Sequence, residues 1–263
     1  MKYIFIPFFL LFIFSSKAQQ LSILKTKNTN SISCVSIDRN GKFFIGDGKG
    51  NITQYDSLGT PLLSFSPTDL STPEIIEAWR TMNIFIFYKE LQRFILLDRF
   101  LTSNSTVTFN STAVGFARVA SISQDNMIWL FDDIDFTLKK YDPISEKNIL
   151  QTPLDLLLNT QDYTILFIRE YQNLVFIADK NEGVLVFDNL GNYKKKISIK
   201  NISYFNFLND EIYFVQNNQI YFLNIYSLEE RKITIPIKNS IIFVLSDTKR
   251  IIAFEKDKFY ILQ

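Results

Sequence analysis

The chain has 263 residues, a formal net charge of +1, no histidine and one cysteine. A charge this close to zero provides no basic surface for a nucleic acid, so we expect no nucleic-acid partner. The missing histidine excludes Ser-His-Asp and Cys-His catalytic sites and His-ligated metals. The single cysteine, Cys34, excludes internal disulfides, so stability must come from an apolar core.

The first 18 residues have the pattern of a signal peptide. Lys2 precedes an apolar run from Tyr3 to Phe14, and small residues follow at Ser16 and Ala18. This pattern predicts cleavage before residue 19. The run is too short to cross a hydrocarbon core of about 30 Å at about 1.5 Å per residue. We therefore expect a signal peptide (1–18), a single mature domain (19–263) and no transmembrane segment after cleavage. The location predicted is the periplasm or the cell surface of a Gram-negative bacterium.

A repeated pattern follows the signal peptide. Five times an apolar strand ends in a bulky residue and then an acid or amide, at intervals of about 36 to 46 residues: Tyr55-Asp56, Leu97-Asp98, Tyr141-Asp142, Phe187-Asp188 and Leu223-Asn224. This is the period of β-propeller blades.

The first repeat shows the pattern most clearly. Asn40-Gly41 and Gly48-Lys49-Gly50 are turn sequences between apolar strands, and successive hairpins of this kind make a four-stranded blade. The strands predicted for blade one are 32–38, 42–47, 51–56 and 61–66. Those for blade two are 74–81, 83–88, 91–98 and 104–109, and those for blade three are 117–123, 126–132, 135–142 and 147–152. Those for blade four are 164–170, 173–179, 183–188 and 193–199, and those for blade five are 202–208, 211–216, 219–224 and 229–235.

The sixth repeat has only three strands, 240–246, 249–254 and 258–262. A closed ring cannot leave the last edge unpaired, because an exposed strand edge promotes aggregation. Residues 21–25, Leu-Ser-Ile-Leu-Lys, supply a spare strand. The sequence thus predicts an all-β fold, a six-bladed β-propeller with four-stranded antiparallel blades, its last blade closed by the N-terminal strand.

Acidic residues gather in two patterns that have structural explanations. The cluster Asp132, Asp133 and Asp135 lacks the spacing of a calcium loop, so we interpret it as a solvated turn. The acids that end the third strands are interpreted as turn caps, because Asn224 replaces the acid in the fifth copy and an amide caps a turn but is no general base. We expect no catalytic residue, no metal site and no cofactor.

Two arginines and several aromatic residues are candidates for a ligand site. Arg80 and Arg118 fall in the predicted innermost strands of blades two and three, where they would line the channel and face an anionic ligand. The aromatic residues either form a ligand platform or pack between blades; they are Trp79, Trp129, Tyr88, Tyr163, Tyr171, Tyr204 and Tyr226.

Two connections between blades are longer than a propeller needs, 68–73 and 153–163. The second contains four leucines in a segment that should be polar. They either tuck beneath the blades or face a partner. The candidate partner-binding residues are Leu154, Leu156, Leu157 and Leu158.

The near-copies Tyr-Asp-Ser-Leu-Gly (55–59) and Phe-Asp-Asn-Leu-Gly (187–191) resemble the exported six-bladed propellers of the NHL/YWTD-like superfamily, although the Tyr-Trp-Thr-Asp motif is absent. The end of the signal peptide resembles that of secreted Bacteroidota proteins. The superfamily resemblance implies either an interaction disc or a calcium-dependent lactonase or lyase, and those enzymes place histidine in the channel. The Bacteroidota resemblance implies a component of an outer-membrane assembly, such as the type IX secretion apparatus.

These observations favour an exported non-enzymatic scaffold that binds a protein partner, an envelope or outer-membrane component, through one face of the propeller. One alternative is a hydrolase or lyase that uses carboxylates or a bound calcium in the channel. Another is the binding of glycan or peptidoglycan by aromatic residues at the rim.

Overall fold

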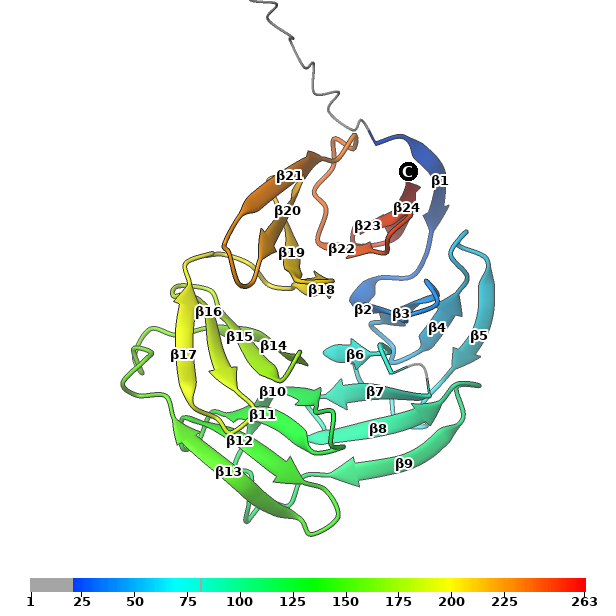
Figure 1. The fold of residues 1–263 in the computed structure, drawn as a ribbon. Helices are drawn as coiled ribbons and strands as arrows, with labels where there is room; N and C mark the ends of the chain where they lie inside the picture. Colours follow the sequence, from blue (N-terminus) through cyan, green and yellow to red (C-terminus); the bar gives the residue numbers. More distant parts are fainter. Residues whose placement is uncertain (1–20, 81) are drawn as a thin grey trace, which may run out of the picture.

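The computed structural model describes residues 21–80 and 82–263. In these residues, 24 strands form six four-stranded antiparallel sheets arranged as blades around a central axis (Figure 1). The predicted fold class is confirmed. The predicted signal peptide lies outside the described residues. Within the described part of the chain, no helix is both long and apolar enough to cross a membrane.

The first five blades follow one another along the chain, each from its innermost to its outermost strand. Blade one contains β2 (Ile32–Ile37), β3 (Phe43–Asp47), β4 (Ile52–Tyr55) and β5 (Pro61–Phe65). Blade two contains β6 (Ile75–Glu77), β7 (Asn83–Tyr88), β8 (Arg93–Asp98) and β9 (Ser103–Thr108). Blade three contains β10 (Ala117–Ile122), β11 (Ile128–Asp132), β12 (Thr137–Asp142) and β13 (Lys147–Pro153). Blade four contains β14 (Ile165–Tyr171), β15 (Leu174–Asp179), β16 (Gly183–Asp188) and β17 (Tyr193–Ile197). Blade five contains β18 (Asn206–Leu208), β19 (Glu211–Gln216), β20 (Gln219–Asn224) and β21 (Glu230–Thr234).

The sixth blade joins the two ends of the described chain. It contains β22 (Phe243–Ser246), β23 (Ile251–Phe254), β24 (Lys258–Leu262) and, as its outermost strand, β1 (Ile23–Asn28). β1 pairs antiparallel with β24, with Lys25 opposite Ile261, and the Ser22 amide donates to the Gln263 carbonyl at 2.7 Å. The predicted closure is confirmed.

Three innermost strands are shorter than the sequence predicts. In blade two, the predicted strand 74–81 contracts to β6, Ile75–Glu77. The backbone leaves the sheet there because the Ala78 amide donates to Oγ of Ser36 in blade one, 3.0 Å away, instead of to its own blade. Arg80 therefore lies beyond the strand in which it was predicted. The innermost strands of blades five and six, β18 and β22, are instead shortened at their starts.

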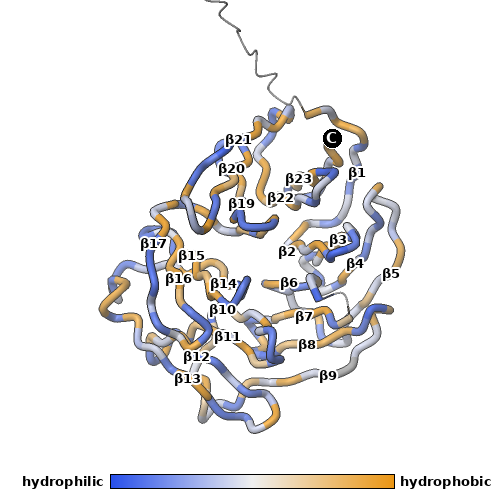
Figure 2. The backbone as a smooth tube through the Cα atoms, viewed as in Figure 1, coloured by the Kyte–Doolittle hydropathy of each residue, from blue (hydrophilic) through white to orange (hydrophobic). Residues whose placement is uncertain are grey.

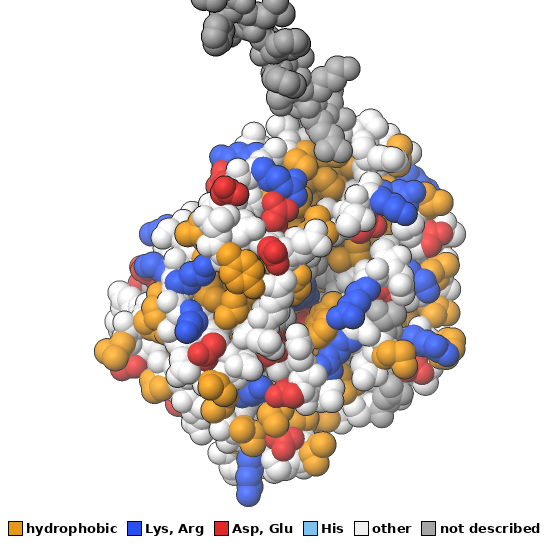
Figure 3. Space-filling model, in the orientation of Figure 1, with side chains coloured by type: hydrophobic (Ala, Val, Ile, Leu, Met, Phe, Trp, Pro, Cys, Tyr) orange, Lys and Arg blue, Asp and Glu red, His pale blue; other side chains and the backbone are white. Residues whose placement is uncertain are grey.

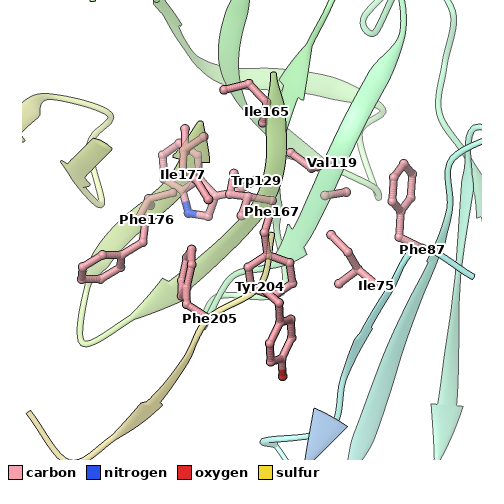
Figure 4. Packing of buried hydrophobic residues seen from close by; sticks show 14 of the residues in the cluster. Ile75, Phe87, Val119, Trp129, Ile165, Phe167, Phe176, Ile177, Tyr204 and Phe205 are labelled. Carbon is pink, nitrogen blue, oxygen red and sulfur yellow. The ribbon is translucent and has the colours of Figure 1, made fainter. Parts of the chain in front are cut away.

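The core lies between neighbouring blades. β7 and β15 are nearly continuous apolar runs, because a blade has another blade on each face. Figure 2 shows this apolar character along the inner strands and a polar outer strand, β17. Figure 4 shows part of the largest cluster, where Trp129, Phe167 and Phe205 come together from successive blades. Cys34 is buried, and burial raises the pKa of its thiol to about 12.

The strand order determines which connections share a face. Strands alternate in direction within each blade, so the first-to-second and third-to-fourth connections emerge on one face. The second-to-third connections and the links between blades emerge on the other. Every loop in the molecule can thus be assigned to one of two faces.

Candidate functional site

A pocket of about 530 Å³ opens on the axis of the propeller, where the innermost strands end. All six blades line it. One lining residue from each blade, in chain order, is Asp38, Trp79, Gln124, Arg169, Asn206 and Ser246. We call it the mouth pocket, and we call the face on which it opens the mouth face. Its volume is in the range of small-ligand sites, roughly 300 to 1,000 Å³.

Aromatic rings form much of the pocket wall. Trp79 lies on one side, and Tyr171 and Phe207 lie on another. The rings of Tyr171 and Phe207 stack with their centroids 4.2 Å apart, and the Tyr171 hydroxyl donates to the Asn209 carbonyl at 2.7 Å. These two contacts hold the rings in one orientation at the pocket wall.

Arg169 is the buried cation of the mouth pocket. It lies near the end of β14, with 3% of its surface exposed. Its Nη1 donates to Oδ1 of Asn206 at 2.6 Å. Its Nε and Nη2 find no acceptor among the described residues, none of which forms an ion pair with it within 4 Å. A guanidinium has five N–H donors, so most of the donor capacity of Arg169 is unused.

Two buried carboxyl groups near Arg169 differ in their environments. Glu170 accepts a hydrogen bond from Nε1 of Trp129 at 2.6 Å and another from the Ser123 hydroxyl. Glu77 accepts from Nε1 of Trp79 at 3.0 Å through Oε2, while its Oε1 has no partner among the described residues. Burial raises the pKa of Glu77, and the positive charge of Arg169 offsets this only in part.

The two arginines proposed from the sequence have other contacts. Arg80 lies at the mouth face, but its guanidinium donates to the carbonyls of Ser123 and Gln124 in blade three. Arg118 lies on β10 and forms an ion pair with Asp133, in a second-to-third connection on the opposite face. Neither lines the mouth pocket. Their binding of an anionic ligand stays a prediction.

The four leucines of the loop between β13 and β14 divide into two kinds. Leu154 and Leu158 are buried in the core, whereas Leu157 is half-buried and Leu156 is 92% exposed. The loop links two blades and lies on the face opposite the mouth. Two of the four therefore tuck under the blades, and partner binding by this loop stays a prediction.

The acids that end the third strands cap turns, as predicted. Oδ1 of Asp56 accepts from the backbone amides of Leu58 and Thr60 at 2.9 and 2.7 Å. In the other four blades with this motif, the capping Asp or Asn likewise accepts a hydrogen bond from the amide of the residue two positions after it.

The residue two positions after the cap is large, apolar or aromatic, and exposed in all five blades, from 51% for Leu58 to 93% for Ile144. We call these five residues the rim ring: Leu58, Phe100, Ile144, Leu190 and Tyr226. Because third-to-fourth connections share a face with first-to-second ones, the rim ring surrounds the mouth pocket.

The interpretation of residues 132–135 as a solvated turn is wrong for Asp132. Its carboxylate is completely buried and 2.7 Å from Nζ of Lys139, which also pairs with Asp135. Amides of Gly115 and Phe116 donate to the same carboxylate. The cluster is a network of charged groups, and its hydrogen bonds to Gly115 and Phe116 fix the connection between blades two and three. No group of three or more metal-ligating side chains is found in the described residues.

The predicted aromatic candidates separate by position. Trp129, Tyr88 and Tyr204 are buried between blades, whereas Trp79 and Tyr171 line the mouth pocket. Arg169 and Glu77 were not singled out from the sequence. The available signal was a charged residue inside an otherwise apolar innermost strand, as in Ile-Leu-Phe-Ile-Arg-Glu (165–170).

No protein-family model and no curated protein matches the chain. Many solved structures do match. One is BamB from Moraxella catarrhalis, with a TM-score of 0.52 and 10% sequence identity over 92% of this chain and 97% of that one. At this identity the likeness shows a shared propeller fold and nothing about function.

Proposed function

We propose that the chain is an exported, non-enzymatic scaffold that binds a protein partner through its mouth face. The rim ring is the observation that carries this proposal. Single exposed apolar residues are common on protein surfaces. Here, however, one such residue occupies the same structural position in five blades around a central pocket. A partner lying across the mouth face would cover all five.

The capping bonds prepare the rim ring for binding. Each exposed side chain belongs to a residue whose amide is held by the preceding Asp or Asn. Tyr226 is held further, because its hydroxyl donates to Oε1 of Gln172 at 2.7 Å. A rigid surface loses less conformational entropy on association, so more of the gain from apolar burial appears as affinity.

The charge distribution also suits a protein partner. Lysine, arginine, aspartate and glutamate are interspersed among apolar groups over the visible surface, with no region of one sign (Figure 3). Nucleic acid would need a basic surface. An apolar centre with mixed polar surroundings is what protein interfaces have.

The setting we propose is the envelope of a Gram-negative bacterium. Residues 1–18 support export, and the NHL/YWTD-like resemblance supports an interaction disc. The partner would be an envelope or outer-membrane component, in an outer-membrane or type IX secretion assembly. The BamB likeness supports the propeller framework on which this proposal rests.

The experiment is affinity isolation from native envelopes with matched variants. The double variant Ile144→Ser, Leu190→Ser removes two rim-ring side chains, and Leu156→Ser removes the similarly exposed leucine of the opposite face. We expect the wild type and Leu156→Ser to retain one stoichiometric protein and the rim variant to lose it. Thermal unfolding must show that all three are folded. Retention by the rim variant would contradict the proposal.

A second candidate is a hydrolase or lyase acting in the channel. It rests on Glu77, a buried carboxyl with a raised pKa beside Arg169, since perturbed acids of this kind gather at active sites. The calcium form of this candidate predicts a melting temperature that falls by several degrees in EDTA, because a bound ion stabilises the folded state. We expect EDTA to leave the melting temperature unchanged.

A further inference from the structure

We propose that the mouth pocket binds a carboxylate attached to an apolar group, through the guanidinium of Arg169. Such a carboxylate belongs either to the C-terminal residue of a protein chain or to a small organic acid. The first source deepens the proposed function, because it would place the end of a partner chain at the centre of the mouth face.

The guanidinium of Arg169 has no counter-ion within 4 Å among the described residues. Arg169 is 97% buried, yet it makes one protein hydrogen bond, to Asn206, and no ion pair with a described residue. A buried charge without a close partner is costly. Nε and Nη2 are neighbours on one edge of the guanidinium, the geometry that takes the two oxygens of a carboxylate side by side. The unused donors therefore match a carboxylate.

The nearby acids do not satisfy this edge. Glu170 is engaged by Trp129 and Ser123. Glu77 interacts with Arg169 through its charge but lies outside ion-pair distance, and burial favours its neutral form. At the pocket wall, Asp38 and Asp247 each use Oδ1 to cap their own turns.

The route to Arg169 is the mouth pocket itself. Nε and Nη2 are closed from solvent by the surrounding side chains, while Arg169 forms part of the pocket lining. A carboxylate in the pocket meets this edge when the guanidinium turns toward the mouth. That movement gives up the hydrogen bond to Asn206 and the contact with the Phe167 ring, whose centroid is 5.4 Å from Cζ, and it gains two charge-assisted bonds.

The pocket wall defines what accompanies the carboxylate. Trp79, Ile37 and the stacked pair Tyr171 and Phe207 give it an apolar and aromatic surface. About 530 Å³ leaves room for an apolar or aromatic side chain together with the carboxylate. A C-terminal Phe or an arylalkanoic acid has this shape and charge.

The test uses three probes that differ in one feature each: N-acetyl-glycyl-phenylalanine, its C-terminal amide, and 3-phenylpropanoate. Binding is measured by calorimetry and ligand-observed NMR on the folded domain. The variants are Arg169→Gln and, as a matched control, Arg231→Gln, an exposed arginine that does not line the mouth pocket. Melting temperatures confirm that both variants are folded.

We expect the free acids to bind the wild type and Arg231→Gln. The amide, and either acid with Arg169→Gln, should bind about tenfold more weakly or worse, the loss expected for a charged hydrogen-bond pair. Tighter binding of the peptide acid identifies a chain end as the ligand, and tighter binding of phenylpropanoate identifies a small acid. Equal binding of acid and amide, no binding of either acid, or unchanged binding to Arg169→Gln overturns the inference.

Arg169→Met separates a ligand-binding role from a structural one. If Arg169 awaits a ligand, replacing its unpaired charge with an apolar chain should leave the melting temperature unchanged or raise it. A large fall would show that Arg169 supports the fold and would contradict the inference. Loss of the partner in the rim-ring variant is independent of these results, so the protein-binding face can stand even where the carboxylate site fails.

Discussion

Nε1 of Trp129 donates a 2.6 Å hydrogen bond to Oε2 of Glu170, and this bond joins blade three to blade four. The indole is completely buried between β11 and β14. Trp129 is thus a wedge between blades, one of the two roles that the sequence left open for it. Its polar edge satisfies a buried carboxyl group while its ring fills the space between the sheets.

Replacing Trp129 with Phe should weaken this junction. The ring volume is largely kept, but Glu170 loses a buried donor. Glu170 keeps its bond to the Ser123 hydroxyl, so the free energy of unfolding should fall by about 0.5–1.5 kcal/mol, the net contribution of one hydrogen bond. Urea unfolding measures it. Tyr226→Phe, which removes an exposed hydrogen bond, should change it little. Equal effects of the two substitutions would show that the buried hydrogen bond contributes no more to stability than the exposed one.

The Lys139 and Asp132 pair should be a second point of sensitivity. Both side chains are nearly inaccessible to solvent. Lys139→Met leaves the buried carboxylate of Asp132 without its cationic partner. We expect a loss of about 3–5 kcal/mol. Lys196→Met, which breaks the exposed pair with Glu182, is the matched control and should change stability little. A loss no larger than that of the control would contradict the account of this network.

Glu77→Gln should stabilise the protein in a pH-dependent way. Burial raises the pKa of Glu77 in the folded state, with Arg169 opposing it, so the unfolded chain releases this proton first. As pH rises from about 4.3, the unfolded value, towards the folded pKa, wild-type stability falls relative to that of the variant. The melting-temperature difference, variant minus wild type, should therefore be more positive at pH 7.5 than at pH 4. A difference that is constant, or larger in acid, would refute the assignment.

Removing β1 should open the ring. A chain that begins at residue 29 lacks the strand that covers β24, and its last blade then presents an unpaired edge. We expect aggregation on refolding or loss of a single cooperative transition, detected by light scattering and calorimetry. A chain that begins at residue 21 is the control. A full melting temperature after the longer deletion would disprove closure by β1.

The sequence predicted the fold well because the repeat is local. Each Asp or Asn that ends a third strand fixes a turn within four residues of itself, so its role can be read without knowing the neighbouring blades. The closing strand was predictable for a related reason, since the last repeat lacked one; it was predicted at residues 21–25 and lies at Ile23–Asn28.

The site was less predictable because it depends on contacts between blades. The Ala78 bond to Ser36 shortens β6 and moves Arg80 out of its predicted strand. Asp132 is buried by Lys139 and by amides from the preceding connection, which spacing alone cannot reveal. Arg169 was missed because the role of a charged residue in an innermost strand depends on which side chains of the other blades surround it, and the sequence does not show these neighbours.

Photo-crosslinking in the native host tests the central claim most directly. A photoreactive amino acid is placed, one position at a time, at Phe100, Ile144 and Leu190 of the rim ring and at Leu156 of the opposite face, all exposed side chains. The account predicts crosslinks from the three rim positions to one and the same protein, and none to it from position 156. Crosslinks to a partner from position 156 alone, or from none of the four, would contradict a protein-binding mouth face.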